Sequence, residues 1–129
     1  MSAILATTLC LFPALSALQP ADEPRTVAEK SGYRATARYD EVVTFIDQLE
    51  HRSPILRRVE LGTSSAGRSI PLLILADPPI ATAEQAAESE KLVVFAFGNI
   101  HAGEVCGKEA LLMLAREIGT TEQHPLLRT

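Results

Sequence analysis

Six consecutive apolar residues at positions 92–97, with the sequence LVVFAF, constrain the fold of this chain more than any other segment. A run of this length and composition is typical of a strand that is covered on both faces. It leads into a loop with glycines at positions 98 and 103, and a helical pattern follows over residues 104–118. Strand, glycine-containing loop and helix in succession predict an α/β fold.

The helix predicted over residues 104–118 has apolar side chains at helical spacing. These are Leu111, Leu114, Ala115 and Ile118. Gly119 follows at the position of a C-terminal cap, since glycine readily adopts the left-handed conformation found there. Cys106, near the start of this helix, is expected to be a small buried hydrophobic residue.

Residues 39–76 predict a helix followed by a β-hairpin. The helix spans residues 39–52 and is expected to begin at Asp40 as its cap. Its apolar stripe consists of Val42, Phe45, Ile46 and Leu49. Residues 55–61 alternate as a strand does, residues 62–68 (GTSSAGR) are turn-rich, and residues 70–76 form a second, apolar strand. The hairpin 55–76 and the strand 92–97 would belong to one incomplete mixed sheet with flanking helices.

An alanine- and glutamate-rich stretch at residues 80–91 predicts either a short exposed helix or an irregular loop. Thr82 and Gln85 have the spacing of a capping box, which favours the helix.

The N-terminus predicts a targeting segment. Residues 3–18 carry no charge, and this apolar run is too short to span a bilayer. Small residues around position 16 precede a polar stretch, so residues 1–17 are expected to be a signal peptide and the mature protein to be secreted or periplasmic. A buried N-terminal helix is the alternative, but Pro13 would break it. Residues 18–38 are then a loose leader, and residues 39–129 are part of one domain.

Composition excludes one class of partner. The 129-residue chain has a net charge of −4 and contains no run of lysine or arginine, so nucleic acid is not an expected partner.

The loop after strand 92–97 carries the residues best suited to chemistry. In open α/β sheets, functional sites form where strands end. His101 and Glu104 are three positions apart, so in a helical turn their side chains point the same way and can share one metal ion. Catalytic zinc commonly takes two histidines and one glutamate and keeps a fourth position open. Spacing alone also permits a loop histidine and an acidic residue in the first turn of a helix.

The stretch from Tyr39 to Ile118 resembles the start of the zinc carboxypeptidase family, of the carboxypeptidase A/B type. A tyrosine opens the first helix, residues 62–68 are similar to the family's Gly-x-Ser-x-x-Gly-Arg hairpin, and a hydrophobic strand leads into His101-x-x-Glu104. The resemblance implies that His101 and Glu104 bind one Zn²⁺ ion and that the substrate is a peptide or protein.

The resemblance also implies that most of the catalytic site is missing from this sequence. In the family, a third ligand (a histidine), the arginines that bind the substrate carboxylate, a tyrosine and the general base, a glutamate, all lie farther downstream. The chain is therefore expected to be a truncated N-terminal part, inactive alone and without a catalytic residue of its own. Gly103 stands where many members of the family have an arginine.

Two other histidines and one glycine-rich segment are not expected to belong to the site. His124 is too constrained by the preceding helix to complete the metal site, and His51 is expected at the end of a helix. The segment 62–69 is close to a phosphate-binding loop, but a strand-like run follows it instead of a helix. Arg68 in this segment either orients the loop or pairs with Glu60.

Two further functional hypotheses remain open from the sequence. One is a related zinc amidase or deacylase that acts on N-acyl amino acids and uses a similar His-x-x-Glu pair. The other is a non-catalytic α/β module or a truncated product.

Overall fold

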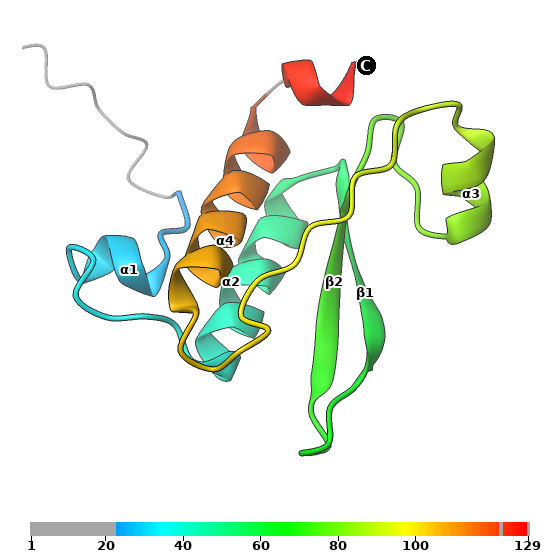
Figure 1. Cartoon of the computed structure of the whole chain (residues 1–129). Helices are drawn as coiled ribbons and strands as arrows, with labels where there is room; N and C mark the ends of the chain where they lie inside the picture. Colours follow the sequence, from blue (N-terminus) through cyan, green and yellow to red (C-terminus); the bar gives the residue numbers. More distant parts are fainter. Residues whose placement is uncertain (1–22, 122, 129) are drawn as a thin grey trace, which may run out of the picture.

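The computed structural model describes residues 23–121 and 123–128 of the chain. The elements are α1 (Val27–Lys30), α2 (Tyr39–Arg52), β1 (Leu56–Thr63), β2 (Ser69–Leu75), α3 (Ala83–Glu88), α4 (Val105–Thr120) and a 3₁₀ turn, η1 (Pro125–Leu127). The described part is thus a mixed α/β arrangement, as predicted. Helices α2 and α4 lie beside each other and pack against the two-stranded sheet (Figure 1). The predicted signal peptide, residues 1–17, lies outside the described residues.

Helix α2 has the predicted bounds and the predicted buried stripe. Phe45, Ile46 and Leu49 are buried, and Leu49 is fully inaccessible. The predicted cap is wrong, because Arg38 occupies the cap position and its backbone N–H donates to Glu41 Oε2 at 2.9 Å. A carboxylate three residues inside the helix thus satisfies the cap N–H, and Asp40 lies in the first turn.

Strands β1 and β2 form the predicted hairpin. They pair antiparallel from Leu56 opposite Leu75 to Thr63 opposite Ser69, with a bulge between Glu60 and Gly62. Arg58 joins β1 to α2, because its guanidinium pairs with Asp47 and its backbone N–H donates to Glu50. The short exposed helix predicted for residues 80–91 is confirmed as α3, and Thr82 and Gln85 form its capping box.

Helix α4 is confirmed, but its buried face differs from the prediction. Leu112 and Ala115 are 5% exposed, whereas Leu114 is 41% exposed. Gly119 is a buried residue inside the helix, and Thr121 is the C-terminal cap. A Cβ at position 119 would lie 3.3 Å from Ser53 Oγ, so the glycine permits close approach to the end of α2 and the predicted capping role is wrong.

One apolar cluster joins α2, α4 and the sheet. Its buried members come from α2, β1 and α4, and Val42, Leu73 and Leu75 pack against it. The buried members are Phe45, Ile46, Leu49, Leu56, Leu112 and Ala115. The core is aliphatic apart from Phe45.

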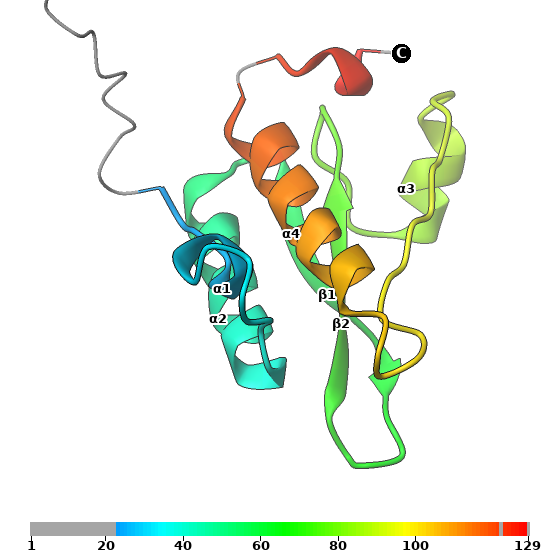
Figure 2. The ribbon, with the colours of Figure 1, turned by 60° about the vertical axis from the view of Figure 1, so that its left-hand side comes forward.

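The prediction of a central strand at residues 92–97 is wrong for the described structure. The segment belongs to no strand, and its large apolar side chains are 59% to 82% exposed. A strand requires a hydrogen-bonding neighbour, and within the described residues β1 and β2 pair only with each other. Figure 2 shows this segment running from α3 to the start of α4 without cover on its outer side.

The segment predicted to be a loose leader is packed on the domain where it is described, from residue 23 to residue 38. Helix α1 begins with a capping box between Thr26 and Glu29. Arg116 of α4 donates to both carboxylate oxygens of Glu29, at 2.7 and 2.6 Å. This hydrogen-bonded ion pair holds α1 against α4.

Glu109 of α4 makes a second link to the same segment. Its Oε1 accepts hydrogen bonds from the Ala37 backbone N–H at 2.6 Å and from the Thr36 hydroxyl at 2.7 Å. Burial by itself raises the pKa of Glu109, but these hydrogen bonds and the nearby Lys108 ammonium outweigh it and lower the pKa. The carboxylate is therefore held in its charged form although the residue is buried.

Candidate metal centre

The predicted ligand pair lies in the loop between residues 92–97 and α4. The Glu104 backbone N–H donates to the His101 carbonyl at 3.0 Å, which closes a turn, and Glu104 is the cap residue of α4. The two side chains converge, with His101 Nδ1 2.9 Å from Glu104 Oε1. A turn of this kind brings side chains three residues apart to the same side.

The two atoms share a hydrogen bond at 2.9 Å. Zinc bound tetrahedrally at about 2.1 Å holds neighbouring ligand atoms about 3.4 Å apart, so a zinc ion would replace this hydrogen bond once the pair opens slightly. The side chains are accessible, with exposed fractions of 78% for His101 and 61% for Glu104. A Cβ added at Gly103 would meet no atom within 4 Å, so the space beside the pair is open.

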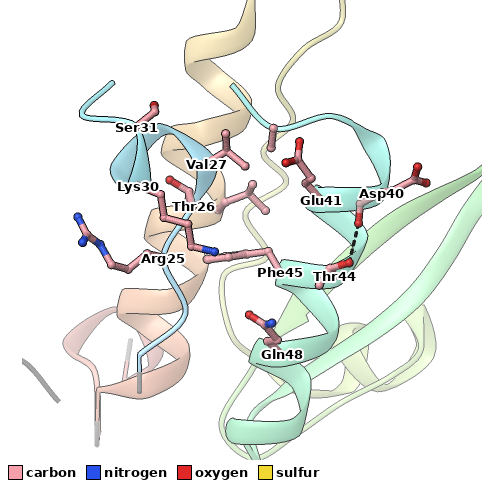
Figure 3. A pocket seen from close by; sticks show the side chains of 12 residues that line it. Arg25, Thr26, Val27, Lys30, Ser31, Asp40, Glu41, Thr44, Phe45 and Gln48 are labelled. Atoms are coloured by element: carbon pink, nitrogen blue, oxygen red, sulfur yellow. Dashed lines mark hydrogen bonds between the residues drawn. The ribbon is translucent and has the colours of Figure 1, made fainter. Parts of the chain in front are cut away.

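The surroundings of the pair differ from the predicted crevice at a strand end. Because residues 92–97 form no strand in the described structure, the pair lies on an exposed loop. The structure has a hollow of about 440 Å³ elsewhere, between α1 and α2, shown in Figure 3. Phe45 and Leu112 line it together with charged side chains such as Lys30 and Asp40, and neither His101 nor Glu104 contributes to it. The hollow is therefore separate from the ligand pair.

The described residues place no third candidate ligand with the predicted pair. Among residues 23–121 and 123–128, no group of three or more histidine, cysteine, aspartate or glutamate side chains is placed to hold an ion. His124 accepts a hydrogen bond from the Leu126 backbone N–H at the start of η1, and His51 Nδ1 donates to the Asp47 carbonyl within α2. His51 thus lies in the last turn of α2, as predicted.

Cys106 is exposed in the first turn of α4, so its predicted burial is wrong. The face of the helix that carries it is not the one that packs on α2 and the sheet. The helical spacing of the apolar residues did not show which face of α4 is buried. Cys106 lies on the surface.

The glycine-rich segment at residues 62–69 is a hairpin turn, and strand β2 follows it directly. The guanidinium of Arg68 lies 5.2 Å from the centre of the Tyr39 ring, over its face. The Tyr39 hydroxyl donates to the Ser69 carbonyl at 2.9 Å. Glu60 accepts from the Thr63 hydroxyl. The contact of Arg68 with Tyr39 links the hairpin to α2, which is neither of the two predicted roles.

Comparison with known proteins gives one match. The family model of zinc carboxypeptidases matches residues 42–128 and so includes most of α2, the hairpin, the predicted ligand pair and α4. No curated protein and no solved structure matches the chain. Since the family model covers more than half of the sequence, the chain belongs to the zinc carboxypeptidase family.

Proposed function

We propose that this chain supplies the first two zinc ligands, His101 and Glu104, of a zinc-dependent carboxypeptidase that hydrolyses peptide bonds. The observation that carries the proposal is the convergence of His101 Nδ1 and Glu104 Oε1 to 2.9 Å in a loop covered by the family match. An imidazole nitrogen and a carboxylate oxygen are two of the ligand types found in catalytic zinc sites. The chemistry that zinc supplies in such sites is polarisation of the substrate carbonyl and activation of a bound water.

The chain's own residues would hold the metal and leave room for substrate. The backbone hydrogen bond from the Glu104 N–H to the His101 carbonyl closes the turn that carries the two ligands. The open space at Gly103 would leave the remaining coordination positions accessible to water and to a peptide. A third protein ligand and a general base are needed for turnover. We therefore propose that the 129-residue chain alone binds zinc weakly and does not hydrolyse peptides.

A titration with Zn²⁺ alone tests the ligand assignment. Ring resonances of the three histidines are followed by NMR, and we expect those of His101 to move while those of His51 and His124 stay. Glu104→Gln should weaken the binding at least about tenfold, because it removes the charged ligand. The matched control is Glu117→Gln, which changes an exposed glutamate at the other end of the same helix. Equal responses of His51 and His101 to zinc would contradict the assignment.

The activity part of the proposal needs a separate assay. The purified chain is incubated with zinc and a peptide that has a free C-terminal carboxylate, and we expect no release of the last residue. Measurable release would contradict the proposed inactivity of the chain alone. An N-acyl amino acid in a parallel reaction examines the amidase alternative.

A further inference from the structure

Two glycines bring the ends of the ligand loop into contact. Gly98 precedes the loop, and Gly107 lies in the first turn of α4. A Cβ at Gly98 would lie 2.8 Å from the Gly107 carbonyl carbon and 2.8 Å from the Lys108 backbone nitrogen. In the other direction, a Cβ at Gly107 would lie 3.6 Å from Gly98 Cα. The two backbones therefore cross with no room for a side chain on Gly98.

This crossing closes the loop that carries the two proposed ligands. His101 belongs to the loop that departs from Gly98, whereas Glu104 is the cap of the helix that Gly98 touches. Asn99, directly after the crossing, has φ of 63°, a conformation that asparagine tolerates better than most residues, and it turns the chain into the loop. The place at which Gly98 rests on α4 thus sets the distance of the loop from the helix.

We propose that Gly98 is a positioning residue for the metal site, acting through its contact with the Gly107–Lys108 peptide to hold His101 in reach of Glu104. The inference rests on the proposed function of the pair as zinc ligands. The Gly98 contact is with backbone atoms, which cannot rotate away as the end of a side chain does. Any side chain at position 98 must push the loop off α4 and move His101 relative to Glu104.

The test compares Gly98→Ala with Gly103→Ala. Both variants add one methyl group to the same loop, but a Cβ at position 103 meets open space. In the metal-free protein, we expect crystal structures to show a wider separation of His101 Nδ1 and Glu104 Oε1 in Gly98→Ala and the native separation in Gly103→Ala. In the zinc titration, Gly98→Ala should bind about tenfold more weakly than the wild type, and Gly103→Ala should bind equally well.

The outcomes separate the inference from the proposed function. A native separation of the pair in metal-free Gly98→Ala would overturn the positioning role, whatever zinc does. If zinc leaves the His101 resonances of the wild type unchanged, the ligand assignment fails, while the metal-free structures still decide what Gly98 does.

A second variant covers the case in which Gly98→Ala does not fold. Gly107→Leu approaches the same crossing from the helix, where leucine is well tolerated and the Cβ itself is in ordinary contact. Atoms beyond that Cβ that turn toward Gly98 displace the loop, and the separation of the pair should then widen again. A folded Gly107→Leu protein in which the loop has moved from α4 while the pair keeps its native separation would overturn the inference.

Discussion

At the scale of single residues, the described part of the candidate site combines a local turn with a contact between the loop and α4. His101 and Glu104 lie on the same side of the turn because they are three positions apart and one backbone hydrogen bond closes it. This part of the site could be predicted from the sequence, since an i, i+3 relation needs no knowledge of the rest of the fold. The contact of Gly98 with α4 could not, because it depends on where two backbones cross. Its only trace in the sequence is a glycine on each side of the loop.

Glu29 makes the free energy of unfolding depend on pH. The hydrogen bonds from Arg116 lower the pKa of Glu29 from 4.5 to about 2, although burial opposes the shift. The unfolded chain therefore binds more protons than the folded chain as the pH falls through this range. The stabilisation is complete above pH 4.5, is lost progressively down to about pH 2, and amounts to about 3 kcal/mol for a shift of this size.

Urea unfolding at a series of pH values from about 6 to 2 measures this dependence. Glu109 also has a lowered pKa, so the informative quantity is the difference between the wild type and Glu29→Gln. We expect the two proteins to differ most at pH 6 and to converge as the pH falls toward 2. Parallel curves throughout the range would show that the ion pair with Arg116 does not have this role.

At the scale of elements, the sequence predicted the bounds of α2 and the hairpin better than which face of α4 is buried. Helix α2 and the hairpin have nearly the predicted bounds, because alternation and helical spacing are strong local patterns. In α4, leucines occur at consecutive positions 111 and 112, so two adjacent faces are apolar and the period alone does not choose between them. Packing against α2 and β2 selects the face of Leu112.

A pair of leucine substitutions in α4 tests this choice of face. Leu112→Ala removes a buried side chain from the core cluster and should lower the free energy of unfolding by about 2–5 kcal/mol. Leu114→Ala makes the same chemical change at a position that is 41% exposed, and we expect a loss below about 1 kcal/mol. Thermal or urea denaturation monitored by circular dichroism measures both. A larger loss for Leu114→Ala would mean that α4 packs through the face predicted from the sequence.

At the scale of the whole molecule, the central strand predicted at residues 92–97 is the part of the fold that the sequence did not predict correctly. The composition of residues 92–97 indicates a strand with cover on both faces, yet strand formation depends on partners elsewhere in the fold. In the described structure these side chains are exposed, and the loop with His101 and Glu104 begins directly after them. Among the described residues, no helix is long and apolar enough to cross a membrane. Residues 92–97 thus form a continuous run in which every large apolar side chain is exposed.

An exposed apolar run with strand-forming composition and no charge should make the chain sparingly soluble. Val94 is 77% exposed in this run, so Val94→Lys should raise solubility and change the free energy of unfolding by no more than about 0.5 kcal/mol. Ala87→Lys in the exposed helix α3 is the matched control, because it changes the net charge equally without altering residues 92–97. Precipitation by ammonium sulfate and light scattering compare the two variants. Each lysine changes the net charge from −4 to −3, so an equal change in solubility in both variants would come from net charge alone. A gain in solubility confined to Val94→Lys would identify residues 92–97 as the surface that limits the solubility of the chain. The proposed ligand pair would then lie directly after that surface in the sequence.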